Sequence, residues 1–180
     1  MTETVVPYFL RFKGDGNIMR VLSMDQSTRV SGYCLFEDGC YIASGIIDMN
    51  KSKLDTYERS FEMAKALWDV IKKYKPDRLI IEDTQQQNNA KTVIILSRLQ
   101  GMIIGYAEAH GVKTHILLPS QWRAELKYSQ GSKVKRAELK QQSIDYVKNN
   151  YNLELSEDEC EAIALNDAAR KKFKIDDIWV

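Results

Sequence analysis

The sequence has few of the residues that build disulfide frameworks or zinc sites. Its three cysteines, Cys34, Cys40 and Cys160, are odd in number, and none of them has the Cys-x-x-Cys spacing. They therefore indicate neither paired disulfides nor a structural zinc ion. The two histidines, His110 and His115, are expected to be structural rather than catalytic. Functional groups are therefore sought among the carboxylates and the basic residues.

Long apolar segments are absent as well. No stretch approaches the roughly 18 to 20 apolar residues that a membrane span needs. The N-terminus also lacks the basic-then-apolar pattern of a signal peptide. We expect an intracellular protein that has no membrane partner.

The length and composition of the chain suit one folded domain. The chain has 180 residues, of which 44% are hydrophobic and 28% are charged, so it is long enough for one core and too short for two full domains. We see no internal repeat and no low-complexity linker. The prediction is a single α/β domain over residues 19–180. Residues 1–18 are predicted to be an N-terminal extension, either a short edge strand or a frayed segment.

Hydrophobic periodicity predicts a five-stranded mixed sheet flanked by α-helices. The expected strands are residues 20–25, 32–37, 41–47, 77–82 and 112–118. The expected helices are residues 53–74, 90–110, 133–150 and 157–172. A short link joins the second and third strands, which predicts a hairpin.

Charge is distributed unevenly along the chain. From Ser120 to Gln142 there are six basic residues and two acidic ones. Between Tyr151 and Asp167 there are six acidic residues and no Lys or Arg. A basic surface beside an acidic cluster suits an enzyme that cuts a polyanion, because cations hold phosphates while carboxylates hold a divalent metal. Two ordinary solvated faces would give the same counts.

The C-terminal helix carries the most informative acids. Ser156 and Glu159 have capping-box spacing, which predicts that the helix starts at Ser156. At 100° per residue, Asp158 and Glu161 then head the apolar stripe of this helix. Carboxylates on a face that packs against the protein are costly unless they are paired, protonated or bound to a cation. Glu159 and its neighbour Glu157 are expected only to favour the helix dipole.

Two further acids end buried strands. Asp25 follows the apolar run that starts at Val21, and Glu82 follows a second run that starts at Leu79. If these strands are neighbours, the two acids emerge side by side, and the C-terminal helix can pack across them. Four converging carboxylates form a hard oxygen site that suits Mg²⁺ or Mn²⁺. Such a site fits two-metal phosphodiester hydrolysis.

These segments also carry a family resemblance. VLSMDQSTRVSGYCLFEDG, KPDRLIIEDTQQQNNAKTVIILSRLQGMIIGYAEAHGV and SEDECEAIAL resemble, in order and spacing, the three acidic blocks of RuvC-type Holliday junction resolvases, and are most similar to the small phage-encoded versions. The likeness covers nearly everything after Met19. It implies a ribonuclease H-like fold, a homodimer and a location in the cytoplasm of a bacterium or a phage-infected host.

The resemblance implies an activity and a set of catalytic residues. The activity is Mg²⁺-dependent paired nicking of four-way DNA junctions, which leaves 5′-phosphate and 3′-hydroxyl ends. Asp25, Glu82, Asp158 and Glu161 take the four metal-ligand positions, for two Mg²⁺ ions that Mn²⁺ is expected to replace. Glu161 stands where bacterial members commonly have Asp. Its longer side chain is expected to change the distance between the metal ions or the choice of metal.

DNA contacts are implied less specifically. The family places basic residues against the phosphate backbone near Arg123 and near Lys133 or Lys135, and Lys127 and Arg136 of the same basic segment are further candidates. Bacterial members also carry an aromatic wedge shortly after the strand-ending Glu. Here the matching stretch is polar, and its DNA-binding candidates are Gln85, Gln86, Gln87 and Asn88. We therefore expect weak sequence selectivity and tolerance for other branched DNA, such as forks and flaps.

Helix 90–110 is where the resemblance places the dimer contact. Gly101 lies where the family's helix crowds its partner, and Gly105 would also allow close approach of two helices. Glycines inside a helix cost helix propensity, which indicates tight packing of some kind.

Three other interpretations stay open at this point. The segment DQSTRVSGY is similar to the first phosphate loop of actin-like sugar kinases, although those enzymes need a second domain that this length does not allow. Another ribonuclease H-like nuclease could cut RNA–DNA hybrids. A junction-binding dimer without catalysis is the third alternative.

Overall fold

A computed structural model describes residues 2–5, 18–85 and 89–175. One mixed sheet runs in the strand order β1-β4-β3-β2-β5-β6. The strands are β1 (Thr2–Val5), β2 (Arg20–Asp25), β3 (Val30–Glu37), β4 (Cys40–Asp48), β5 (Arg78–Glu82) and β6 (Lys113–Leu117). The neighbouring pairs β1–β4, β4–β3 and β3–β2 are antiparallel. The pairs β2–β5 and β5–β6 are parallel.

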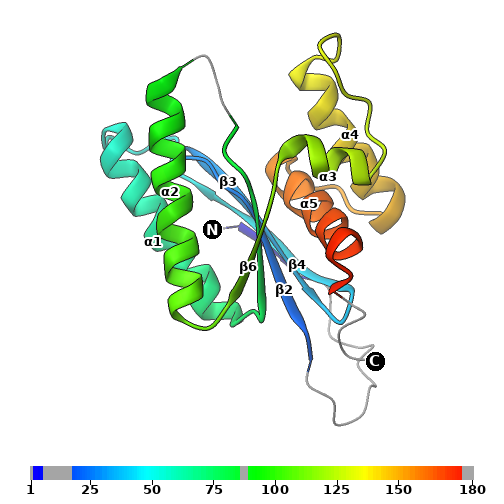
Figure 1. Cartoon of the computed structure of the whole chain (residues 1–180), viewed down its shortest axis with the longest axis horizontal. Helices are drawn as coiled ribbons and strands as arrows, with labels where there is room; N and C mark the ends of the chain where they lie inside the picture. Colours follow the sequence, from blue (N-terminus) through cyan, green and yellow to red (C-terminus); the bar gives the residue numbers. More distant parts are fainter. Residues whose placement is uncertain (1, 6–17, 86–88, 176–180) are drawn as a thin grey trace.

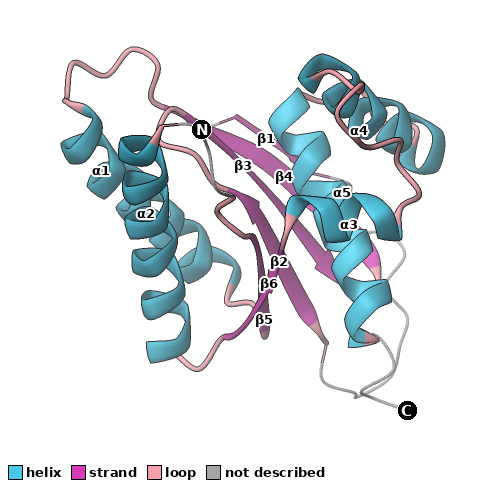
Figure 2. Cartoon of the chain, turned by 45° about the horizontal axis from the view of Figure 1, so that its top comes forward, coloured by secondary structure: helices cyan, strands magenta, loops and turns pink. Residues whose placement is uncertain are grey.

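Helices cover both faces of this sheet (Figure 1). The helices are α1 (Thr56–Tyr74), α2 (Ala90–Ala109), α3 (Pro119–Glu125), α4 (Arg136–Tyr151) and α5 (Glu157–Phe173). α1 and α2 lie on one side of the sheet, and α3, α4 and α5 lie on the other (Figure 2). Within the described part of the chain, no helix has the length and apolar character that crossing a membrane requires.

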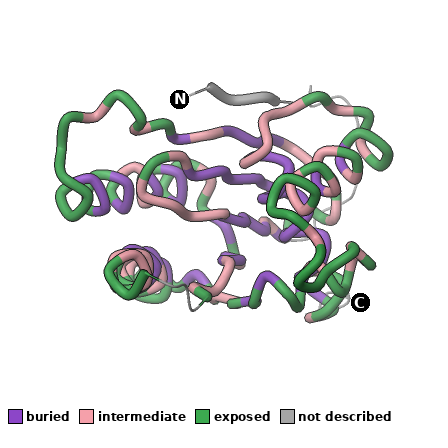
Figure 3. The backbone as a smooth tube through the Cα atoms, turned by 90° about the horizontal axis from the view of Figure 1, so that it is seen from above, coloured by how far each residue is buried: buried purple, intermediate pink, exposed green. Residues whose placement is uncertain are grey.

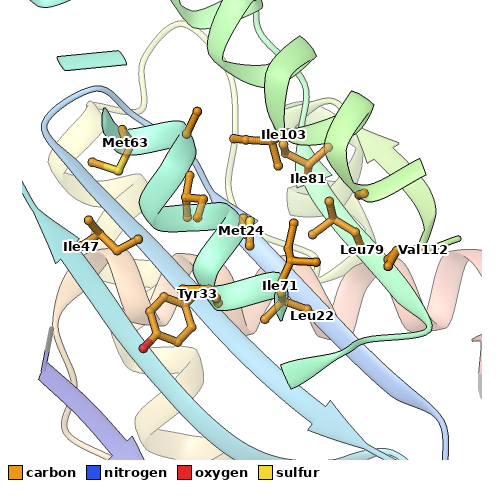
Figure 4. Packing of buried hydrophobic residues seen from close by; sticks show 14 of the residues in the cluster. Leu22, Met24, Tyr33, Ile47, Met63, Ile71, Leu79, Ile81, Ile103 and Val112 are labelled. Atoms are coloured by element: carbon orange, nitrogen blue, oxygen red, sulfur yellow. The ribbon is translucent and has the colours of Figure 1, made fainter. Parts of the chain in front are cut away.

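The larger hydrophobic core lies between the sheet and α1 and α2 (Figure 4). Fully buried aliphatic side chains from both layers meet there, among them Met24, Leu67, Ile81, Leu99 and Ile103. Burying one such side chain stabilises the fold by about 1.5–3 kcal/mol. This core therefore holds the C-terminal ends of β2 and β5 firmly in the sheet.

Strand alternation decides which face of the sheet receives the acids. Met24 and Ile81 point into the core under α1 and α2. Successive residues of a strand point to opposite faces. Asp25 and Glu82, which follow them, therefore project to the face covered by α3, α4 and α5.

Helix α5 is buried along most of its length. Figure 3 shows that buried residues gather in the inner part of the molecule, while exposed residues lie on its outer helices and loops. All residues from Glu159 to Ala169 are buried, because α5 contacts four strands of the sheet and also α3 and α4. Small side chains at Ala162, Ala164 and Ala168 let its backbone lie close to the sheet. The buried surface of α5 is thus wider than the single apolar stripe predicted from the sequence.

The α/β fold class and the predicted elements are confirmed, with two additions. The five predicted strands end within two residues of the observed ones, and the four predicted helices within three. A sixth strand, β1, pairs with β4 at the edge of the sheet. The predicted count of five strands is therefore one short, and the edge strand that was one of the two alternatives for residues 1–18 is observed at Thr2–Val5. The short helix α3 was not predicted, because seven residues carry little periodicity. Its sequence signal is Pro119 at the first helical turn.

Candidate active site

Asp25 and Glu82 end neighbouring parallel strands. Met24 pairs with Ile81 in the β2–β5 register, so the next residue of each strand is one of the two acids. The expectation that they emerge side by side is confirmed. Each is held by backbone hydrogen bonding of the sheet, which keeps a ligand position precise.

Helix α5 brings two more carboxylates to the same place. Ser156 is its N-cap and forms the predicted capping box with Glu159. Carboxylate oxygens of Asp25, Asp158 and Glu161 all lie within 4.8 Å of one another. Three of the four predicted acids thus form one cluster at the junction of β2 and α5.

This close approach depends on Gly32. Gly32 lies opposite Asp25 in the β2–β3 ladder. A Cβ atom at this position would collide with the backbone carbonyl group of Asp158. The lack of a side chain at Gly32 therefore lets the first turn of α5 reach the strand that carries Asp25.

Glu159 has a larger role than the helix-dipole effect predicted for it. Its side chain is 7% exposed. One carboxylate oxygen accepts a hydrogen bond of 2.7 Å from the Ser44 hydroxyl, and the other accepts one of 2.7 Å from the Ser156 hydroxyl. Glu159 therefore ties the start of α5 to β4 and faces away from the acidic cluster. Glu157, in contrast, is partly exposed and pairs with Lys140.

Glu82 is held separately from the three clustered acids. Its Oε2 atom accepts a hydrogen bond of 2.6 Å from the indole Nε1 of Trp122 on α3. Its backbone carbonyl accepts hydrogen bonds from the side-chain amides of Gln26 and Gln100, at 2.6 and 3.1 Å. Three donors from different segments therefore fix both the main chain and the side chain of Glu82. Trp122 was not identified from the sequence, because α3 was not.

Basic side chains face the acids. Arg123 of α3 forms an ion pair with Glu161 at 3.5 Å. Lys140 and Arg136, both on α4, are close enough to favour the charged forms of Asp158 and Glu161. Three cations thus oppose four carboxylates. Lys140 was not among the predicted DNA-binding residues, although it belongs to the basic segment.

Burial raises the pKa of all four carboxyl groups. For Asp25, burial and then repulsion by Glu82, Glu161 and Asp158 raise the pKa well above its usual value. Burial raises the pKa of Glu82 to about 7, although the Trp122 hydrogen bond and Arg123 act in the opposite direction. Burial also raises the pKa of Asp158 and of Glu161, against Lys140. Such crowding is unfavourable unless a bound cation compensates it.

The acids open into a cleft of about 280 Å³. Asp25, Glu82 and Glu161 line it, together with Arg123, Arg136, Lys140 and Gln85. Of the predicted DNA-binding residues, the structure therefore brings Arg123, Arg136 and Gln85 to the site. Lys127, Lys133 and Lys135 are exposed and are not among the residues that line this cleft. Gln86, Gln87 and Asn88 lie outside the described residues.

The donor set fits a hard divalent cation. It consists of carboxylate oxygens, without a cysteine or histidine among the clustered residues. Oxygen-only sites suit Mg²⁺ and Mn²⁺ rather than zinc. Arg123 lines the cleft, so its guanidinium group can donate to an anion there.

Sequence comparisons relate most of the chain to one family. Residues 18–172 match the family described as Lactococcus phage M3 protein. The chain is also similar to the crossover junction endodeoxyribonuclease RuvC of Syntrophomonas wolfei, with 27% identity over 70% of this chain and 75% of that protein. For RuvC of Caldanaerobacter subterraneus, the identity is 33% over 57% of this chain and 64% of that protein. The aligned part is therefore just under two thirds of the second relative.

Structural comparisons agree on the fold. Thermus thermophilus RuvC, solved in complex with a Holliday junction substrate, matches with a TM-score of 0.67 and 12% identity, over 87% of this chain and 96% of that one. The yeast mitochondrial Holliday junction resolvase Ydc2 matches with a TM-score of 0.53 and 19% identity, over 88% and 80%. The ribonuclease H-like α/β fold predicted from the sequence is thereby confirmed.

Proposed function

Because the chain belongs to the family described as Lactococcus phage M3 protein, and resembles RuvC resolvases in sequence and fold, we propose that it is an endodeoxyribonuclease. Its substrate is a four-way DNA junction, with forks and flaps as further branched substrates. It acts as a homodimer and makes paired nicks that leave 5′-phosphate and 3′-hydroxyl ends. The observation that carries the proposal is the convergence of Asp25, Asp158 and Glu161 at a cleft that Arg123, Arg136 and Lys140 also line.

The four acids would hold the metal. Asp25, Asp158 and Glu161 offer oxygens close enough to share one ion, and Glu82 lies on the neighbouring strand to complete a two-ion site. Bound Mg²⁺ ions would supply an activated water and stabilise the charge on the departing 3′ oxygen. Mn²⁺ is expected to substitute, because it takes the same oxygen ligands.

The basic residues would bind and orient the DNA strand. Arg123 lies against Glu161 and lines the cleft, so its guanidinium group would bind the phosphate next to the scissile bond. Arg136 and Lys140 line the same cleft and would neutralise the adjacent phosphates. Gln85 at the rim can donate to phosphates or base edges. Contacts of this kind orient a backbone and carry little sequence information.

The proposal is tested by cleavage of a labelled four-way junction. The wild-type protein, with Mg²⁺ or EDTA, is compared on this junction, on a linear duplex of the same sequence and on an RNA–DNA hybrid. Symmetric, metal-dependent nicks confined to the junction are expected. Asp158→Asn should lower the rate by at least about a thousandfold and retain junction binding, since it removes one carboxylate ligand.

A matched control is Glu154→Gln. It removes one carboxylate that is 84% exposed and pairs with Lys148 at the surface, so cleavage should stay at the wild-type rate. Binding without cutting by the wild type would identify a non-catalytic junction-binding protein. Equal or faster attack on the RNA–DNA hybrid would identify a different ribonuclease H-like nuclease.

A further inference from the structure

Trp122 combines complete burial with a short hydrogen bond to a carboxylate. Its side chain has 0% exposure and packs in the core beneath α3 and α5, beside Ile80 and Leu117. Its one hydrogen-bond donor, the indole Nε1, is directed to Oε2 of Glu82 at 2.6 Å. A buried indole N–H needs an acceptor, and here that acceptor is a carboxylate at the candidate metal site.

This contact restrains the one part of Glu82 that the backbone leaves free. The main chain is held by pairing in β5 and by the amides of Gln26 and Gln100 on its carbonyl oxygen. The side chain of a glutamate can still rotate about three bonds, so the backbone alone does not fix where its carboxylate group lies. A short hydrogen bond from a rigid, fully packed ring removes that freedom.

The contact also selects the oxygen that is available. Oε2 already accepts the indole N–H, so Oε1 is the atom with the larger capacity to bind a cation. Arg123, the next residue of α3, pairs with Glu161. The same short helix therefore contacts one acid on β5 and one acid on α5, and sets the spacing between them.

From this geometry we propose that Trp122 is a positioning residue for Glu82: it holds the carboxylate in one rotamer and presents Oε1 to a divalent cation. The proposal rests on the proposed function only in treating Glu82 as a metal ligand. It assigns α3 a role in the site that differs from DNA contact. Trp122 itself touches neither metal nor substrate.

Binding of Mn²⁺ in the absence of DNA tests the proposal directly. The variant is Trp122→Phe, which keeps an aromatic ring in the core and removes the N–H donor. Its Mn²⁺ dissociation constant, measured by electron paramagnetic resonance of the free ion, should rise at least about tenfold, as expected for loss of an orienting partner. Trp68→Phe is the matched control, because its indole donates to the Met102 carbonyl on the α1–α2 side of the sheet. It should leave the dissociation constant unchanged.

Two further measurements separate positioning from packing. In a Glu82→Ala background, Trp122→Phe should cause no additional loss of Mn²⁺ affinity. In the wild-type protein, the Trp122 indole resonance, assigned by through-bond correlation to its own backbone, should shift on addition of Mg²⁺, while the Trp68 indole resonance stays in place. This second measurement does not depend on whether the variant folds.

Several results would overturn the proposal. Unchanged Mn²⁺ affinity in Trp122→Phe, an undiminished loss in the Glu82→Ala background, or an indole resonance insensitive to Mg²⁺ would each make Trp122 a core residue only. A wild-type protein that binds no Mn²⁺ at all would overturn the metal-dependent nuclease as well. A wild type that binds Mn²⁺ and cuts junctions, with a Trp122→Phe variant that does both equally well, would overturn this inference alone.

Discussion

At the residue scale, Glu82 illustrates the conflict between stability and function in this site. It is one of four carboxyl groups whose pKa values burial raises. Folding therefore places charge where solvation is poor and like charges are close. A protein that needed only stability would have neutral residues here. The acids make sense as ligands, since a bound cation converts their mutual repulsion into attraction.

The first prediction at this scale concerns pH. The pKa of Glu82 is about 7 in the folded protein, against 4.5 for an unperturbed group. The folded state therefore binds more protons than the unfolded state between these values, and stability falls as pH rises through this window. Without divalent cations, the free energy of unfolding should decrease by roughly 2–3 kcal/mol between pH 4.5 and pH 8 from this group. Urea unfolding in EDTA at several pH values measures it.

Glu82→Gln is the control for this pH dependence. It removes the titrating group and keeps an oxygen that can accept from Trp122, so the slope should become shallower and stability at pH 8 should increase. A variant with the same slope as the wild type would show that Glu82 does not titrate in this range.

At the element scale, the site is built by the packing of α5 on the sheet. Gly32 permits the contact between β3 and the first turn of α5, and Glu159 anchors that turn to Ser44 of β4. Further along the helix, Ser23 donates to the Ala162 carbonyl at 2.7 Å and accepts from the Asn166 amide at 3.2 Å. These buried polar contacts fix the register of α5, and with it the positions of Asp158 and Glu161.

The prediction at this scale is that Gly32→Ala damages the site more than the fold. The added methyl group meets the Asp158 carbonyl, so α5 must move away from Asp25. We expect a loss of about 1–3 kcal/mol in stability, as for other overpacked sites. Cleavage of the four-way junction should fall at least about tenfold, because ligand oxygens tolerate little displacement.

Cys34→Ala is the matched control for Gly32→Ala. Cys34 is fully buried on the same strand and packs under α5 with Cys160 and Ala162. Its replacement removes volume instead of adding it, so stability should fall while Asp158 stays near Asp25. Equal cleavage by Gly32→Ala and Cys34→Ala, at matched stability, would contradict a special role for Gly32.

At the scale of the whole molecule, α2 presents an exposed face that the monomer does not use. Ile94 is 50% exposed, and Ser97, Arg98, Gly101 and Gly105 are exposed on the same side of the helix. A Cβ atom added at Gly101 or Gly105 would meet nothing within 4 Å. The tight packing predicted around these glycines is therefore absent within one described chain. If the protein is a homodimer, as proposed, the tight packing around these glycines would be made with α2 of the second copy.

The corresponding prediction uses Gly101→Arg. Inside the monomer the change is harmless, and it removes a glycine that costs about 1 kcal/mol of helix propensity. On the α2 face of a dimer, a large charged side chain would keep two helices apart. We expect a folded monomer in sedimentation analysis that nicks single strands and has lost paired, symmetric cutting.

Ala109→Arg is the control, because it adds the same charge at the exposed last turn of α2. It should leave the assembly and paired cutting unchanged. A dimeric Gly101→Arg protein with normal paired cutting would move the interface elsewhere.

Local sequence patterns were enough to predict most of the helices and strands and to single out the four acids. Alternation and apolar runs located β2 and β5 together with the acids that end them, and the Ser156–Glu159 spacing located the start of α5. These features depend on local geometry, which repeats every two or 3.6 residues and can be read from a linear chain. Strand β1 and helix α3 have only four and seven residues. Segments this short show little periodicity, so local pattern did not predict them firmly.

The contacts that support these acids depend on the three-dimensional packing of the chain. That Trp122 donates to Glu82, that Gly32 admits the backbone of Asp158, and that Glu159 binds Ser44 are contacts between residues at least 40 positions apart. No local pattern encodes them, because each depends on which elements become neighbours after the sheet has formed. The acids of the candidate site can thus be located from their place at the ends of strands and at the start of a helix, whereas their orientation is a property of packing.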